Sequence, residues 1–127
     1  MNPRTFAAIV AVAFLALAAG LSSATRIASA ETTETSTDGT IVVHAVDQAF
    51  SPSTVTVSAG ASVTIRLVND DTFDNEHDLE IKGIGKTNGT CFGPCELSVT
   101  FTAPTTPGEY AFFCIVHDDM NGVLVVK

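Results

Sequence analysis

The C-terminal segment reads Tyr110-Ala-Phe-Phe-Cys114-Ile-Val-His117-Asp-Asp-Met120-Asn-Gly-Val-Leu-Val-Val126. Tyr110, Phe112 and Cys114 share one parity and an apolar run ends the segment, which predicts two strands joined by a short loop. Cys114 is therefore expected to point into the core with Tyr110 and Phe112. The loop brings a thiol, an imidazole and a thioether close enough together in sequence to reach one ion.

The same alternation of apolar and polar residues recurs upstream, and residues 40–127 show no helical period. Gly, Pro and Asn/Asp turns separate the alternating stretches. The expected strands cover residues 41–47, 54–58, 63–67, 77–82, 97–102, 110–114 and 123–126. Short strands separated by such turns predict an all-β sandwich or barrel.

His77 opens one of these expected strands and shares the parity of Leu79 and Ile81, so its imidazole should also face the core. An inward polar group at a strand end needs a partner, and a metal ion would be one. Two His, one Cys and a weak axial Met form the ligand set of a blue-copper site. We therefore predict one copper ion bound by His77, Cys114, His117 and Met120.

Each of these residues has an ordinary structural interpretation when taken alone. A single Cys or Met is commonly a buried apolar side chain. It is the joint placement of four such residues at the ends of inward-facing strands that favours a metal site. His44 lies in the middle of the first expected strand and is interpreted as structural.

Zinc accepts the same Cys and His donors, so a zinc site is the alternative. A catalytic zinc site would also need a general base. Glu76, Asp78, Asp118 and Asp119 lie near enough in sequence to be candidates. Acidic residues in such positions more often form a solvated rim.

The N-terminal 30 residues have the pattern of a secretory signal peptide. Met1-Asn-Pro-Arg4 is a positive n-region, an uncharged apolar run follows, and Ala28-Ser29-Ala30 offers a cleavage site. An uncleaved membrane anchor is the alternative, although the apolar run is shorter than the roughly 20 residues that span a bilayer. Residues 31–39 are polar and Thr-rich and are expected to be a flexible tether. Residues 40–127 are then one small domain.

Downstream of residue 30 the chain is strongly acidic. It keeps four cationic side chains against all 14 acidic ones, a net charge of −10 (4 − 14). This charge argues against nucleic acid or anionic lipid as a partner. It favours a cationic partner or serves solubility alone.

Cys91 and Cys95 form the sequence Cys91-Phe-Gly-Pro-Cys95. In an exported chain two such neighbours are expected to form a disulfide. That pairing leaves Cys114 as the odd cysteine, free for copper. A second soft-metal site and a redox-active pair are the alternatives.

Taken together, these motifs resemble the cupredoxins, the type 1 blue-copper proteins, over essentially all of residues 40–127. The N-terminal half resembles the family in Phe50-Ser-Pro52, Thr54-Val-Thr-Val57, Gly60 and the stretch from Val63 to Asn69. The C-terminal half, Tyr110-x-x-x-Cys114-x-x-His117-x-x-Met120-x-Gly122-x-x-Val125-Val126, is very similar to the short ligand loop of amicyanin. Plastocyanin-like proteins keep Cys-x-x-His and place the Met further on.

The resemblance implies a Greek-key β-sandwich of about seven to eight strands. It implies that His77, Cys114, His117 and Met120 bind the copper and that the exposed edge of His117 is the route for the electron. Asp78 stands where the family usually has Asn, whose side chain ties the two ligand loops together. A carboxylate there is expected to change the hydrogen bonds around the site.

The surroundings of the site depart further from the family pattern. Asp118 and Asp119 follow His117, and Asp70, Asp71, Asp74 and Glu76 precede His77. These acidic residues argue against the apolar docking patch that the family often shows, and they would suit a redox partner with a basic surface. The Cys91–Cys95 segment is an addition to the minimal family pattern.

The expected function is that of a monomeric, non-enzymatic carrier of single electrons in the periplasm or another extracytoplasmic space, soluble or membrane-tethered. Copper binding and delivery without electron transfer is the alternative. Copper enzymes built from cupredoxin domains need further His-rich copper sites and several domains, whereas this chain has only three His. A metal-free sandwich would leave Cys114 without a role.

Overall fold

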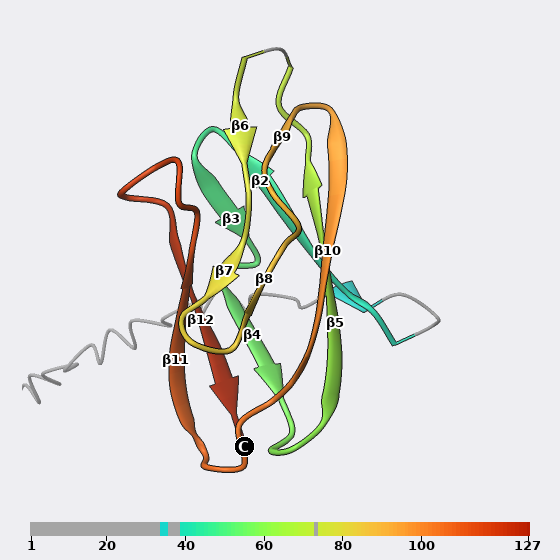
Figure 1. Cartoon of the computed structure of the whole chain (residues 1–127), viewed down its shortest axis with the longest axis vertical. Helices are drawn as coiled ribbons and strands as arrows, with labels where there is room; N and C mark the ends of the chain where they lie inside the picture. Colours follow the sequence, from blue (N-terminus) through green and yellow to red (C-terminus); the bar gives the residue numbers. More distant parts are fainter. Residues whose placement is uncertain (1–33, 36–38, 73) are drawn as a thin grey trace, which may run out of the picture.

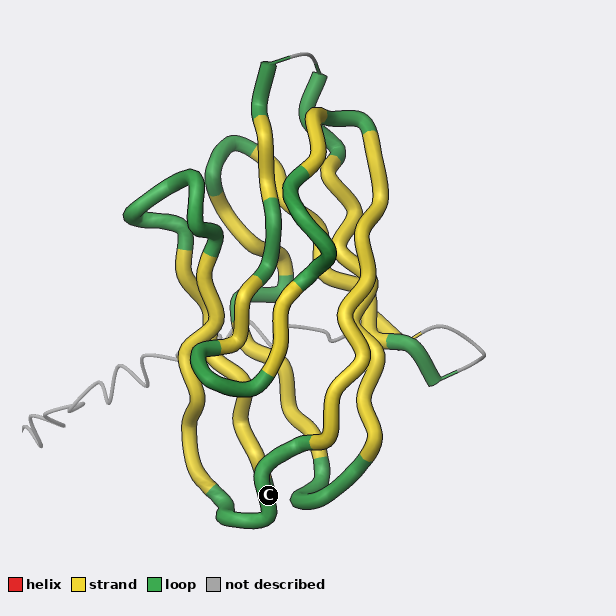
Figure 2. Tube along the Cα trace, viewed as in Figure 1, coloured by secondary structure: helices red, strands yellow, loops and turns green. Residues whose placement is uncertain are grey.

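The computed structural model describes residues 34–35, 39–72 and 74–127. The expected signal peptide lies outside these residues, as does most of the expected tether. The described part of the chain consists of strands and loops (Figure 2). None of its segments forms a helix that could cross a bilayer.

Twelve strands occur among the described residues. Seven have three or more residues: β2 (Ile41–Val46), β3 (Ala49–Ser51), β4 (Thr54–Val57), β5 (Ser62–Asn69), β10 (Cys95–Thr102), β11 (Gly108–Phe113) and β12 (Asn121–Val126). Five have two residues: β1 (Glu34–Thr35), β6 (Glu76–His77), β7 (Glu80–Ile81), β8 (Gly85–Lys86) and β9 (Cys91–Phe92).

Two five-stranded sheets form the body of the molecule (Figure 1). One sheet has the order β1-β2-β5-β10, with β3 paired to β2, and the other has the order β4-β12-β11-β7-β8. The pairs β2–β5 and β4–β12 are parallel and the others are antiparallel. The chain changes between the two large sheets from β3 to β4, from β4 to β5, from β5 to β7, from β8 to β10 and from β10 to β11. The predicted all-β sandwich is confirmed, and β6 and β9 form a small third sheet.

The core lies between the two large sheets and follows from the alternation in the sequence. In β5 the inward positions Val63, Ile65 and Leu67 are buried, and the positions between them are partly exposed. Phe112 of β11 is fully buried and packs edge-to-face on Phe50, with 5.1 Å between the ring centroids. Burial of each such side chain contributes about 1.5–3 kcal/mol.

The expected strand over residues 77–82 is broken. His77, Leu79 and Ile81 are buried as predicted, but Asp78 is buried too, so strict alternation fails there. The chain forms β6, leaves the ladder and resumes as β7. Because of this break, His77 pairs with Cys91 of β9, whereas Ile81 pairs with Phe112 of β11.

Gly122 allows the second strand of the C-terminal hairpin to pass close to the core. It lies opposite Phe112 in the β11–β12 ladder. A Cβ atom at this position would overlap the Phe112 ring and lie 2.7 Å from the backbone oxygen of Ser53. The close approach requires a residue without a side chain here, two positions after Met120.

Candidate metal centre

The four predicted ligands come from two segments at one end of the sandwich (Figure 1). His77 is the last residue of β6, and Cys114 directly follows β11. His117 lies in the loop between β11 and β12, and Met120 is the residue before β12. His77, Cys114 and Met120 therefore stand where a strand meets a loop, as the sequence predicted, whereas His117 lies within the loop itself.

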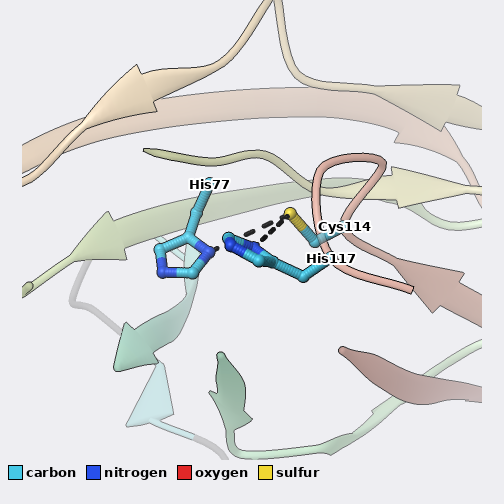
Figure 3. Close-up of side chains that lie close together, drawn as sticks. All are labelled: His77, Cys114 and His117. Carbon is cyan, nitrogen blue, oxygen red and sulfur yellow. Dashed lines mark hydrogen bonds between the residues drawn. The ribbon is translucent and has the colours of Figure 1, made fainter. Parts of the chain in front are cut away.

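The structure brings His77, Cys114 and His117 together (Figure 3). One ligand atom from each lies within 4.8 Å of the others. The Cys114 Sγ is 3.9 Å from the His77 Nδ1 and 3.7 Å from the His117 Nδ1. The two imidazole rings are tilted by 49°, with their centroids 4.8 Å apart. Both imidazoles thus turn the same type of nitrogen toward one sulfur.

Burial differs across the cluster. His77, Cys114 and Met120 are buried, and His117 is partly exposed. The loop is closed by two backbone hydrogen bonds: the Met120 N–H donates to the His117 carbonyl and the Cys114 N–H donates to the Met120 carbonyl, both at 3.1 Å. These bonds hold the three loop residues in a compact turn. The role of Met120 as axial ligand stays a prediction.

Burial raises the pKa of the Cys114 thiol above its ordinary range in the metal-free protein. The Asp78 carboxyl raises this pKa further, although backbone contacts partly oppose both effects. A metal ligand must be the thiolate, so binding a metal at Cys114 releases a proton.

Asp71 contributes to the site, although the acidic run around it predicts an exposed rim residue. That prediction is wrong, because Asp71 is buried and its Oδ2 lies 2.9 Å from the His77 Nε2. The hydrogen bond from His77 is the main reason why the pKa of Asp71 lies below its ordinary value. One acidic residue within an acidic run gives no sequence signal that separates it from its exposed neighbours.

Asp78 ties the two ligand segments together. Its buried Oδ1 accepts a hydrogen bond of 2.8 Å from the Ile115 N–H, the residue after Cys114. The carboxylate thus links the segment that carries His77 to the loop that carries Cys114. The interpretation of Asp78 as a solvated rim residue is wrong, because its side chain is buried.

The Cys91–Cys95 disulfide is present, as predicted, and Cys114 is a free, buried cysteine. Cys91 lies opposite His77 in the β6–β9 pair. Next to it, the Asn69 Nδ2 donates to the carbonyl oxygens of Cys91 and Asn75, both at 3.0 Å. The disulfide segment therefore braces the strand that carries the first imidazole.

The donor set fits copper. A soft thiolate with two imidazoles is typical of copper sites, and copper binds most tightly among the divalent ions of the first transition row. No carboxylate belongs to the cluster of possible metal-binding groups in the described part of the chain. Glu76 accepts a hydrogen bond from the Thr90 hydroxyl, and Asp118 and Asp119 are exposed. The general base that a zinc enzyme would need is therefore not among the clustered donors.

Exposed apolar side chains directly precede the partly exposed imidazole in the ligand loop. Ile115 and Val116 are 57% and 42% exposed and directly precede His117. Asp118 and Asp119 directly follow it and are also exposed. The loop therefore presents apolar and acidic groups in sequence on either side of His117.

Comparisons with known proteins agree with this architecture. The family described as "cupredoxin-like domain" matches residues 7–126. Auracyanin A, a blue copper protein from the green thermophilic photosynthetic bacterium Chloroflexus aurantiacus, is 27% identical over 69% of this chain and 98% of its own, with a TM-score of 0.60. A search of curated proteins gave no match.

Two further solved structures share the fold. A variant of amicyanin in its reduced state is 23% identical over 78% of this chain and 95% of its own, with a TM-score of 0.53. A copper-containing nitrite reductase from Thermus scotoductus is 25% identical over 69% of this chain but only 22% of its own, with a TM-score of 0.51. The family match spans nearly the whole sequence, and the chain belongs to the cupredoxin family.

Proposed function

We propose that this protein is a type 1 blue-copper protein that carries single electrons between extracytoplasmic redox partners. One copper ion would be held by His77, Cys114 and His117, with Met120 as the weak axial ligand. The observation that carries the proposal is the convergence of two imidazole Nδ1 atoms on the Cys114 sulfur, with all three donors within 4.8 Å. When bound, the copper supplies a one-electron Cu(II)/Cu(I) couple.

The residues around the site would hold the copper ligands in the same positions in the Cu(II) and Cu(I) states. Asp71 is hydrogen-bonded to His77, Asp78 links the two ligand segments, and the disulfide segment pairs with β6 through β9. Two backbone bonds close the loop from Cys114 to Met120. Ligands held in this way need little rearrangement when an electron arrives or leaves.

The partly exposed His117 offers the route for the electron. Ile115 and Val116 beside it provide an apolar contact area, and Asp118 and Asp119 add negative charge. Together with the net charge of −10 (4 − 14) downstream of residue 30, these groups suit a partner with a basic surface. Steering of this kind raises the association rate and weakens as salt is added.

The proposed location is outside the cytoplasm. The N-terminal sequence has the pattern of a signal peptide or anchor, and the Cys91–Cys95 disulfide suits an oxidising compartment. We take residues 40–127 as the copper-binding domain, preceded by a leader at 1–30 and a tether at 31–39. The protein would act as a monomer and without catalysing a reaction of its own.

Copper delivery without electron transfer is the second candidate. A delivery protein must release its ion readily, whereas three of the four predicted ligands here are buried. Exchange of bound copper with a chelator would separate the two functions. Slow copper exchange with fast oxidation and reduction would support the electron carrier. Fast copper exchange with slow oxidation and reduction would support copper delivery.

The visible spectrum of the purified protein after addition of one equivalent of Cu(II) tests the proposal. We expect an intense blue band that a mild reductant bleaches and an oxidant restores. Cys114→Ala should abolish the band, and His44→Ala should keep it because His44 lies outside the cluster. A colourless protein would refute the proposal and would favour a zinc site instead.

Transfer to a partner is tested with a basic, one-electron redox protein such as a cationic cytochrome. The rate should fall as salt rises, and Asp118→Asn with Asp119→Asn should lower both the rate and its salt dependence. A rate independent of salt and of these substitutions would contradict the proposed docking face.

A further inference from the structure

Asp71 is a buried carboxylate outside the predicted ligand set. Its side chain is 6% exposed. Its Oδ2 accepts hydrogen bonds from the His77 Nε2–H at 2.9 Å and the Asn75 Nδ2 at 3.0 Å. Its Oδ1 accepts a third from the Asp47 N–H at 3.1 Å. The Asp47 backbone N–H and the Asn75 NH2 group can only donate, so these contacts favour an ionised carboxylate.

This contact fixes the hydrogen positions on His77. An ionised carboxylate has no hydrogen to give, so the Nε2 of His77 must carry one. In the neutral ring the Nδ1 then keeps its lone pair, and this atom faces the Cys114 sulfur at 3.9 Å. The contact therefore selects the tautomer that presents an electron pair to a metal.

Asp71 is itself held in place. Its N–H donates to the Asn69 Oδ1 at 3.1 Å, and the Asn69 amide binds the carbonyls of Asn75 and Cys91. Gly93 of the disulfide segment passes so close that an added Cβ would overlap the Asp71 backbone oxygen. The turn that carries Asp71 is therefore closely packed against the disulfide segment.

We propose that Asp71 is a positioning residue of the metal centre, which sets the orientation and tautomer of His77 and places a fixed negative charge behind it. This inference rests on the proposed copper site. A negative charge in the protein interior stabilises the more positive state of a nearby redox centre. Asp71 should therefore favour the oxidised form and lower the reduction potential.

The charge and the hydrogen bond are separated by two substitutions. Asp71→Asn keeps an oxygen acceptor for His77 but removes the charge, whereas Asp71→Ala removes both. With Asp71→Asn, the ratio of reduced to oxidised protein at a fixed ambient potential should rise at least about tenfold, a shift of about 59 mV for one electron. With Asp71→Ala, metal affinity should fall by about 10- to 100-fold.

Asp70→Asn is the matched control, because it removes the same charge from the neighbouring residue. The Asp70 side chain is 45% exposed and paired with His44, so solvent screens its charge. Its effect on the reduced-to-oxidised ratio should be no more than about twofold. Equal effects of Asp70→Asn and Asp71→Asn would overturn the charge argument.

A second readout needs no metal. In the NMR spectrum of the metal-free protein, the His77 Nε2–H should be visible and slow to exchange, and Asp71→Ala should remove it. Persistence of that signal in a folded Asp71→Ala variant would overturn the positioning role. If Asp71→Ala does not fold, Asp71→Asn decides: it should keep the signal, and its loss would count against the proposal. Failure of the copper site itself would show separately, as a wild-type protein without the blue band.

Discussion

Replacement of Asp78 by Ala should destabilise the protein and loosen the ligand loop. Asp78 is 3% exposed, and its Oδ1 accepts the Ile115 N–H at 2.8 Å. A hydrogen bond to a charged group contributes about 1.5–3 kcal/mol, and its removal leaves the N–H without a partner. In a domain of this size each kcal/mol corresponds to about 4–8 °C in Tm, so we expect a fall of about 6–24 °C.

Thermal and urea unfolding of the metal-free protein measure this loss, and amide hydrogen exchange locates it. The Ile115 N–H should exchange faster in Asp78→Ala than in the wild type, while amides in the middle of β5 should change only with global stability. Asp119→Ala is the surface control, because Asp119 is exposed and should cost less than about 0.5 kcal/mol.

Asp78→Asn provides the decisive comparison. The Asn side chain keeps an oxygen of the same shape toward Ile115 and should retain stability to within about 1 kcal/mol. If Asp78→Asn lost as much stability as Asp78→Ala, the negative charge rather than the acceptor would be the important property. If Asp78→Ala lost no more than Asp119→Ala, the proposed link between the ligand segments would be refuted.

Four further substitutions or conditions test other parts of the structure. Met120→Leu should keep copper but shift the potential, since an axial ligand tunes the site; loss of all copper would show that its role is misassigned. Cys91→Ser should keep the blue band and lower stability by about 2 kcal/mol, the value for a short disulfide loop; a changed band would place the disulfide within the metal site. Gly122→Ala should cost about 1–3 kcal/mol in urea unfolding because its Cβ overlaps the Phe112 ring, and the cost should shrink in a Phe112→Leu background. Because the pKa of Asp71 is lowered in the folded state, its contribution to the stability of the metal-free protein is complete above its ordinary value of 3.8 and is lost as the pH falls below it; the stability difference from Asp71→Asn should vanish over that range.

The alternation of the sequence predicted most of the sandwich, because one face of each long strand packs in the core. It also placed His77 and Cys114 correctly, since their parity follows that of buried neighbours such as Leu79 and Phe112. The short Cys114-x-x-His117 spacing likewise predicted that His117 lies near Cys114, and the two belong to one cluster in the structure.

The residues that support the ligands could not be predicted in the same way. The inward turn of Asp78 breaks the alternation, and the burial of Asp71 depends on a turn closed by Asn69 and the disulfide segment. Both carboxylates accept hydrogen bonds from backbone N–H groups distant in sequence, those of Asp47 and Ile115. Local pattern carries no information about such long-range hydrogen bonds.

The division of the predicted ligands between two chain segments has a thermodynamic consequence. Cys114, His117 and Met120 lie within seven residues of one another and stay neighbours when the chain unfolds, whereas His77 joins them only in the native fold. A ligand stabilises the native state only by the excess of its affinity for that state over its affinity for the unfolded chain. Copper would therefore raise the midpoint of unfolding by less than its native affinity implies, and the increase that is observed would measure the affinity that His77 and the fold add to that of the local loop.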